Sequence, residues 1–553
     1  MRMLKIITTL STSLMLTGCM VGPDFMRPEA EVNDAWIDTD EAAVRSEEAE
    51  YTQWWTVFND QALNELIDLA YQQNLSLRMA GLRVLEARAR RGIAEGMFYP
   101  QVQRLSAGAA AVSLSDNDPN AFPLDRDFND YSTSFDALWE LDFWGKYRRG
   151  VESADAALLA SVDDYDGALV SLIGEVAATY IQTRTFEKRL AIAHENVKLQ
   201  ERTLEIADVR FRNGAVTELD ASEAKSNLAN TKALIPLLEN GLRQSKITLS
   251  ILLGMPPSEL NDVLAQTGVI PSAPTEVAVG IPADLLRRRP DVRSAEQLAA
   301  ALSAKVGVAK SEQYPSISVL GSTGFRTGDS IGTDGTQKDI DDLLDSDSYF
   351  GFIGLGVNLP ILNYGRIKNN VRIQDARYQQ AAVNYQNTVL RAAAEVESGL
   401  SSYLKSMQRA EHLSESVTAT ERSVELSMTQ YREGEVTFNR VLAAQSFLVA
   451  QQDQLAAAES QIALNLVSTY KSLGGGWEIS KNQPFVPDVI RKEMRERTDW
   501  GDIMTAGPTS DDEIDEPAVR QKSDGSSDPD NPVRNEQPWR HVIQSSADAS
   551  RSD

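Results

Sequence analysis

The sequence predicts a mixed fold: long α-helical hairpins that pack as coiled coils, joined to four β-strands per chain, with the whole plan present twice. The first observation is a repeat, since residues 210–217 (RFRNGAVT) return as residues 430–437 (QYREGEVT). The second is that residues 145–210 and 365–431 contain no proline. The third is that residues 135–143 and 349–361 alternate between apolar and smaller or polar side chains. A register held over such distances indicates a duplicated structural unit.

The composition restricts the class of protein. The chain has 553 residues, with 54 basic and 80 acidic side chains and a net charge of −26. This balance argues against nucleic-acid binding, which depends on Lys and Arg side chains that neutralise phosphates. The acidity indicates a solvated surface or, alternatively, an acidic lumen.

Residues 1–18 are predicted to be a signal peptide. Arg2 and Lys5 precede an apolar stretch at 6–16, which is too short to span a membrane as a helix. Residues 16–19 (LTGC) resemble a bacterial lipobox, in which Cys19, the single cysteine, becomes the lipidated first residue. Met20 follows where an aspartate would favour the inner membrane, so an outer-membrane lipoprotein is expected. The alternative is an ordinary signal peptide with an incidental cysteine.

The rest of the chain divides into five parts. Residues 19–58 form an extended, proline-punctuated segment, 59–254 the first repeat, 255–281 a linker rich in Pro and Val, and 282–476 the second repeat. Residues 477–553 form an acidic tail, predicted to be largely disordered because residues from about 498 to 553 are rich in Asp, Ser, Pro and Glu and poor in apolar residues.

Each repeat is expected to contain a β-hairpin, at about 99–145 and 314–364. In the first repeat, helices near 60–72 and 75–97 precede it, and Tyr99-Pro100 ends the second of them. Along its second arm, Phe135, Trp139 and Phe143 alternate with Asp136, Glu140 and Asp142. Period two puts the aromatic rings on one face and the three carboxylates on the other. This suits lipid outside and a water-filled lumen inside; a half-buried strand of a soluble protein is the alternative.

Two long helices follow the hairpins, over residues 145–210 and 365–431. At a rise of 1.5 Å per residue each is roughly 100 Å long. Return helices are expected at 217–252 and 437–472, with Pro236 predicting a kink or local widening in the first. Apolar residues in both return helices repeat every seven positions, which is typical of coiled coils: Leu228, Ile235, Leu242 and Leu249, and Val441, Leu448, Leu455 and Ile462.

The turns between these helices centre on Gly214 and Gly434, which suit the left-handed conformation after a helix end. Four membrane strands per chain cannot close a barrel, because small closed barrels need about eight and lipid does not tolerate open sheet edges. At least two chains must therefore share one barrel, and three would supply twelve strands. These features predict a shared conduit rather than a catalyst.

The chain resembles the outer membrane factors of the TolC/OprM type, and within them the NodT-type efflux lipoproteins. The resemblance covers about residues 19–480 and is carried by the lipobox followed by VGPDF, the paired Arg-x-Gly tips, the duplicated Leu-Gly ends, and above all the run LLRRRPDVR at 285–293. It implies a homotrimer with a twelve-stranded barrel in the outer-membrane lipid and a helical tunnel in the periplasm. It also implies docking to a periplasmic adaptor and an inner-membrane pump, most often a resistance-nodulation-division drug exporter.

The resemblance and the charges together suggest site residues. The expected adaptor-docking tips are Arg210, Arg212, Gly214, Val216, Thr217, Arg432, Gly434, Val436 and Thr437. The hypothetical gate at the tunnel entrance comprises Arg212, Asp220, Glu223, Arg432, Glu433 and Glu435, with oppositely charged members forming ion pairs that hold the entrance shut. Relatives often carry an acid after the second tip, whereas this chain has Ala443 there, which weakens the case for an acidic ring.

No enzyme or cofactor site is predicted. The three histidines, His194, His412 and His541, are isolated, and no nucleophile–base pair, phosphate loop or metal cluster occurs in the sequence. The arginine run at 287–289 is interpreted as a helix boundary with paired charges. The leading function is the passive exit duct of a tripartite efflux pump for drugs or other small toxic compounds. The alternatives are the duct of a type I (ABC) protein secretion system and a structural coiled-coil lipoprotein.

Overall fold

The computed structural model describes residues 20–37, 44–45, 51–115, 127–260, 263–264, 269–274, 277–278, 286–329 and 338–504. The chain separates into two units, Met1–Thr505 and Ala506–Asp553, and every described residue belongs to the first. Cys19, His541 and the end of the predicted tail lie outside the described residues.

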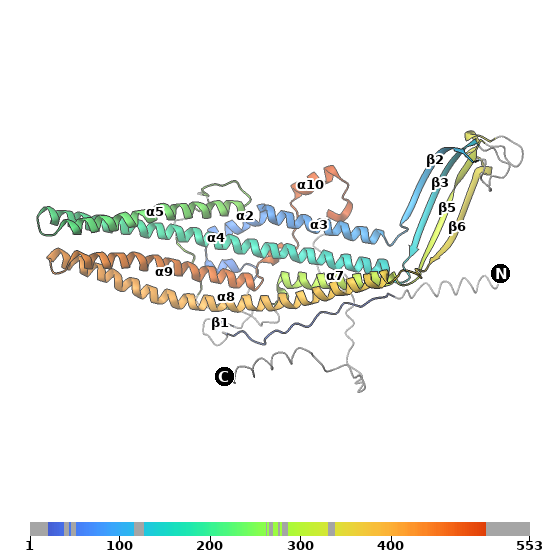
Figure 1. Cartoon of the computed structure of the whole chain (residues 1–553). Helices are drawn as coiled ribbons and strands as arrows, with labels where there is room; N and C mark the ends of the chain where they lie inside the picture. Colours follow the sequence, from blue (N-terminus) through green and yellow to red (C-terminus); the bar gives the residue numbers. More distant parts are fainter. Residues whose placement is uncertain are drawn as a thin grey trace, which may run out of the picture. The chain divides into compact units, whose positions relative to one another are not determined.

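Two long helical hairpins dominate the described part of the chain (Figure 1). The first consists of α4 (Lys146–Arg212) and α5 (Glu218–Leu252), and the second of α8 (Arg366–Glu433) and α9 (Phe438–Ser472). Both pairs of helices start 220 residues apart, so the repeat predicted from the sequence is confirmed. Helix α5 continues through Pro236, and the kink or local widening expected there stays a prediction.

The predicted heptad columns contribute to the packing between these helices. In the first return helix Leu228 and Leu249 are buried, and in the second Val441 and Leu448 are buried. The other four members of the two columns are half-buried. A seven-residue apolar period therefore marks a helix–helix seam here, as expected for coiled-coil packing.

Three shorter helices accompany the hairpins. Helix α2 (Gln61–Gln73) begins at Asp60, whose side chain accepts a hydrogen bond from the Leu63 backbone, and α3 (Leu75–Gly96) begins at Asn74 in the same way. Capping of this kind satisfies backbone N–H groups that have no partner within the helix. Helix α7 (Pro290–Ser311) packs against both α4 and α8.

The four strands form one antiparallel sheet in the order β2-β3-β5-β6. Their bounds are Val102–Ser113, Asp127–Leu141, Ser316–Gly328 and Tyr349–Asn358. Both predicted β-hairpins are present, although the last strand ends at Asn358, short of the alternation expected to 361. Short 3-10 turns, η2 (Ile340–Asp342) and η3 (Ser346–Ser348), precede β6.

The register of the sheet separates two faces. Trp139, Val319 and Leu355 lie side by side in one row, and Leu105, Phe135 and Thr323 in another row of the same face. Arg104, Asp136 and Ser322 form a row on the opposite face, because successive residues of a strand alternate sides. Leu355 is 74% exposed in the single chain, so its apolar side chain is uncovered. One face is thus mainly apolar and the other largely polar.

An aromatic core lies midway along the helices. Trp54 and Trp55 of the short helix η1 (Trp54–Phe58) are buried, and the Trp54 ring stacks on Tyr470 of α9 at a centroid distance of 5.3 Å. Residues of α2, α3, α4, α8 and α9 complete the same core. A two-residue parallel pair, β1 (Val44–Arg45) with β4 (Val277–Ala278), joins the N-terminal segment to the linker.

The tail assigned to residues 477–553, with disorder expected from about 498, is structured over its first 28 residues. The chain continues as η4 (Trp477–Ser480), α10 (Asp488–Arg497) and η5 (Gly501–Met504). Phe485, Val486 and Met504 are buried in the aromatic core. Apolar residues are few in this segment, but a few well-placed side chains suffice to dock it onto an existing core.

The arginine run before α7 is a helix boundary with paired charges, as predicted. Pro290 occupies the first turn of α7, a position that proline favours. Arg289 is buried and binds Asp291, Glu395 at 2.7 Å and the Ser472 carbonyl oxygen at 2.7 Å. Arg288 pairs with Glu478, so the run connects α7 to α8, α9 and η4.

Candidate functional site

Both tips of the long hairpins turn at a left-handed glycine. Gly214 has a φ of +69° and Gly434 a φ of +84°. The Ala215 N–H donates to the Arg210 carbonyl and the Glu435 N–H to the Gln430 carbonyl, each at 2.9 Å. This pattern closes a helix C-terminus with a residue that tolerates positive φ. The left-handed conformation predicted for the two glycines is confirmed.

The two tips of one chain are held together by a tyrosine that the sequence reading did not single out. Tyr431, at the end of α8, donates its hydroxyl hydrogen bond to Asp220 of α5 at 3.2 Å. Arg210 lies over the Tyr431 ring, 4.6 Å from its centroid, and also donates to the Tyr431 carbonyl oxygen. Burial, followed by the nearby Asp220 carboxylate, raises the pKa of Tyr431 to about 12.

A small apolar cluster surrounds this contact. Phe438 packs on Tyr431 at 5.4 Å, and both are 2% exposed. Val216 and Val436 pack against the same cluster, half-buried. The signal that could have identified it was present in the sequence: aromatic residues bracket the second turn, at 431 and 438, whereas the corresponding positions of the first turn are Phe211 and Glu218.

The hypothetical gate is not assembled within one chain. Arg212, Arg432, Glu433 and Glu435 are exposed, Glu223 is half-buried, and none of them forms an ion pair with the other tip among the described residues. Asp220, expected to pair with an arginine, binds Tyr431 instead. The described tips of one chain are therefore joined by this hydrogen bond and the apolar cluster, and the gate of paired charges stays a prediction for the assembled protein.

Thr217 and Thr437 occupy equivalent places at the N-caps of α5 and α9. Both have extended backbones, with ψ of 162° and 156°, and neither side chain caps its helix. The Thr217 hydroxyl lies 3.5 Å from the Asp220 carboxylate. Both threonines are exposed, so their hydroxyl groups are accessible from solution.

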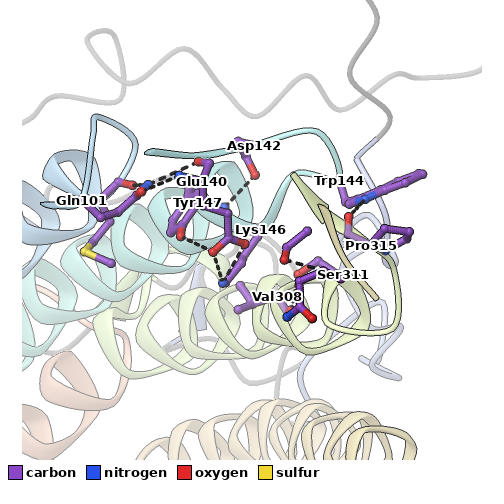
Figure 2. Close-up of polar contacts among 12 residues, drawn as sticks. Gln101, Glu140, Asp142, Trp144, Lys146, Tyr147, Val308, Ser311 and Pro315 are labelled. Atoms are coloured by element: carbon purple, nitrogen blue, oxygen red, sulfur yellow. Dashed lines mark hydrogen bonds and ion pairs between the residues drawn. The ribbon is translucent and has the colours of Figure 1, made fainter. Parts of the chain in front are cut away.

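The other end of α4 carries a polar network at the junction with the sheet (Figure 2). Lys146 donates to both carboxylate oxygens of Glu140, at 3.0 and 3.1 Å, and the Tyr147 hydroxyl donates to the same carboxylate at 3.0 Å. The Gln101 side chain binds the backbone of Glu140, at 2.7 Å to its N–H. Burial and the Glu140 carboxylate raise the pKa of Tyr147. The network connects the end of strand β3 to the start of helix α4.

Asp142 is not a lumen residue, contrary to the sequence prediction. It follows the end of β3, and its carboxylate accepts hydrogen bonds from the backbone N–H groups of Tyr147 and Arg148, both at 3.0 Å. The side chain is 5% exposed and also pairs with the Arg148 guanidinium. Asp142 therefore caps α4. Asp136 remains on the polar face of β3, opposite Arg104.

The N-terminal segment docks beside this network. The Val21 N–H donates to the Trp144 carbonyl at 3.1 Å, and Trp144 stacks on Tyr314 with its indole N–H on the Pro315 carbonyl at 2.7 Å (Figure 2). A side chain at Gly145 would lie 2.8 Å from Met20. Met20 and Val21 therefore lie at the junction of the sheet and the helices.

The described part of the chain contains no metal site, no cluster of histidines and no membrane-spanning helix. No cluster of His, Cys, Asp and Glu among those residues could hold a metal ion. His194 and His412 are exposed on the long helices. None of the helices described is both long and apolar enough to cross a bilayer.

A two-faced antiparallel sheet continuous with helical hairpins of this length defines the protomer of an outer-membrane channel. A family model described as outer membrane efflux protein matches residues 66–255 and 281–475, which coincide with the two repeats. The chain belongs to this family, whose members are channels of the outer membrane and not enzymes.

Known proteins align with this chain over most of its length. Nodulation protein T of Rhizobium leguminosarum bv. viciae is 30% identical over 468 residues, 85% of this chain and 93% of the relative. The pyoverdine export outer membrane protein OpmQ of Pseudomonas putida is 30% identical over 430 residues, 77% and 88% of the two chains. The solved outer-membrane channel OprN is 31% identical, with a TM-score of 0.76 over 83% of this chain and 100% of that one.

Proposed function

We propose that the chain is the outer-membrane exit duct of a tripartite efflux assembly, working as a homotrimer whose strands share one twelve-stranded barrel. The observation that carries this is the pair of free edges, β2 and β6, of the two-faced sheet. Unpaired strand edges are not tolerated in lipid. Joining the sheets of further copies edge to edge pairs these free strand edges. In a barrel of three copies, the apolar faces point toward lipid and the row with Asp136 points toward water.

Lipid anchoring at Cys19 supports the same placement. Met20 and Val21 are held against Trp144 and Gly145, at the base of the sheet. Aromatic residues gather at membrane–water interfaces, and Tyr99 and Tyr364 are exposed in the same region, by 66% and 96%. Acyl chains attached to the residue before Met20 would therefore enter the membrane where the barrel ends.

The proposed partners engage the opposite end of the long helices. Helix α4 has 67 residues, which extends the tips roughly 100 Å from the sheet. The exposed residues there, Arg212 and Arg432 among them, are the surface offered to a periplasmic adaptor that connects to a resistance-nodulation-division pump. The cargo is proposed to be a small toxic compound, since OpmQ is named for the export of pyoverdine, another small molecule.

Photo-crosslinking in living cells tests the partner. Val216 and Val436 are half-buried, so the photoreactive residue is better placed at the neighbouring exposed positions Ala215 and Glu435. We expect capture of an adaptor that serves a proton-driven drug exporter, with no capture from a matched position on the exposed extracellular side of the sheet, Asp347. Capture of an ABC-exporter adaptor would instead assign the duct to protein secretion. An assembled trimer that captures no adaptor would refute the tripartite proposal.

A further inference from the structure

A cavity of about 660 Å³ lies between α4 and α8, at the level where α9 ends and α7 begins (Figure 1). Helix α9 ends at Ser472 and α7 begins at Pro290, and each of these helices contacts both α4 and α8. The row of helix between α4 and α8 is therefore interrupted at this point, and the interruption leaves the cavity. Its volume is within the range of small-molecule binding sites.

The cavity lies on the face of the helices that is turned away from the aromatic core. On α8, Val396 and Leu400 belong to the aromatic core. Ser398 and Ser402, from the same turns of the helix, line the cavity. The core side is covered by η1 and by residues 477–504, whereas the cavity side is not. In the proposed trimer, the uncovered side borders the water-filled tunnel.

Helix α8 presents a polar stripe to this cavity and to an adjoining one of about 390 Å³. The members of the stripe follow one another at alternating intervals of four and three residues. A helix that packs against another helix carries apolar side chains at such intervals. Every member of this stripe is polar, which is typical of a face in contact with water: Asn384, Thr388, Arg391, Glu395, Ser398 and Ser402.

Two cations in the larger cavity are not paired. Arg391 and Lys471 make no hydrogen bond or ion pair with any residue that the structure describes, and both are exposed. Arg289, by contrast, binds Asp291 and Glu395, so these two carboxylates are already engaged. The lining thus has three cations against two carboxylates, a net charge of +1 in a chain of net charge −26.

Hydroxyl groups add further donors beside the two cations. Ser398, Ser402 and Ser468 line the cavity, and their hydroxyl groups are likewise without a partner within the described part of the chain. The planar guanidinium of Arg391 matches the two oxygens of a carboxylate, and the ammonium of Lys471 adds a compact positive charge. The serine hydroxyls can donate to an acid group held between these cations.

We propose that this cavity binds the acid group of a small carboxylate-bearing molecule on its way through the duct, with Arg391 and Lys471 as the binding groups. The inference rests on the proposed function and deepens it, because it assigns organic anions to the cargo. An anion is repelled by a strongly acidic chain, and a cavity with positive charge raises its local concentration. Because both cations are exposed, salt screens them, and binding is weak enough for release.

The adjoining cavity sets the direction in which such a molecule lies. It adds one further charged group, Asp164, whose carboxylate accepts a hydrogen bond from Ser294 at 2.6 Å. A carboxylate there repels an acid group. The acid group of the ligand therefore stays at the end with Lys471, and an uncharged or basic part extends toward Asp164.

Saturation-transfer NMR with benzoate tests the site on the purified full-length protein in lipid nanodiscs. Benzamide is the matched probe, because it has the same ring without the charge and reports partitioning into lipid. We expect benzoate to bind the wild type at low salt and the double variant Arg391→Gln/Lys471→Gln to lose roughly tenfold in benzoate affinity, as expected when charge-assisted hydrogen bonds are removed. The benzamide signal should be the same in both proteins.

Two further variants separate the cavity from general charge and shape effects. Lys405→Gln/Arg409→Gln removes two cations from exposed positions of α8 outside the cavity lining, and it should bind benzoate as the wild type does. Ser398→Trp keeps both cations but fills the cavity, and it should lose binding while its helical circular dichroism is unchanged.

The site would be overturned by a wild type that binds no benzoate, by an equal loss in the Lys405→Gln/Arg409→Gln control, or by full binding in Ser398→Trp. The cavity is lined by one chain alone, so its failure differs from that of the proposed function. Capture of an adaptor without benzoate binding would remove only the site. Benzoate binding without capture of an adaptor would remove only the tripartite assembly.

Discussion

Asp166, on α4 beneath the C-terminal segment, gives the chain a pH-dependent stability that one substitution should remove. Its carboxyl accepts a hydrogen bond from Ser480 at 3.3 Å and lies 3.3 Å from Arg293, with Asp163 and Glu478 nearby. Burial is the largest cause that raises its pKa, from 3.8 to about 7, and it outweighs the attraction of Arg293. The folded chain therefore binds this proton more tightly than the unfolded chain.

The sign of the effect follows from this difference. Stability from this group is greatest below pH 4, falls as the pH rises toward 7, and is constant above that, because the unfolded chain releases the proton first. Each pKa unit corresponds to about 1.4 kcal/mol, so a shift of about three units gives an upper figure of about 4 kcal/mol. Asp166→Asn keeps a neutral acceptor for Ser480 and Arg293. We expect it to match the wild type near pH 4 and to be more stable at pH 8.

Thermal unfolding of the detergent-solubilised protein, followed by helical circular dichroism from pH 4 to 8, measures this difference. Asp164→Asn is the matched control, since Asp164 is exposed two residues away and binds Ser294 at 2.6 Å. The control should differ from the wild type by the same amount at every pH. An Asp166→Asn variant that melts below the wild type at pH 8, or a gap that does not change with pH, would refute the reasoning.

Four further predictions concern the junction, the tips and the barrel. Asp142→Ala leaves two backbone N–H groups of α4 uncapped and should lower the free energy of unfolding by about 1–3 kcal/mol, measured by urea titration, whereas the Asp142→Asn variant should lose less; equal losses would contradict the capping role. Tyr431→Phe keeps the ring but removes one charge-assisted hydrogen bond, worth about 1.5–3 kcal/mol, and should raise the open probability of channels in planar bilayers; unaltered gating would remove this contact from the closed state. Neutralising Arg212 and Arg432 together should raise single-channel conductance if their partners belong to neighbouring copies, and no change excludes them from the gate. Asp136→Asn should reduce cation preference in reversal-potential measurements, and an anion preference of the wild type would refute an acidic lumen.

Sequence reasoning located the elements well because their signals are local and repeated. Gly145, Gly214 and Gly254 all have positive φ, as do their equivalents Gly365, Gly434 and Gly474, and glycine at a helix end is one of the strongest positional signals in a sequence. The alternation in β3 likewise fixed the two faces of the sheet, since a period of two leaves no other assignment.

The sites were harder to predict because they depend on contacts between distant parts of the chain. Asp142 has the sequence spacing of a strand residue, yet the strand ends one residue earlier and its carboxylate turns to α4. The aromatic pair at 431 and 438 marks the second turn in the sequence, but only the fold places Asp220 beside Tyr431, 211 residues away. Similarly, Phe485 and Met504 belong to a core that is formed mainly by residues before 475.

The two copies of the hairpin differ at their tips. The aromatic residues at 431 and 438 form a buried contact between the two tips of one chain, while their equivalents in the first copy, Phe211 and Glu218, are exposed. In the trimer proposed above, the contacts between chains therefore cannot repeat the contact that joins the tips within each chain. We expect such a ring to loosen between chains before the two tips of one chain separate, because the buried aromatic pair is present only within the chain.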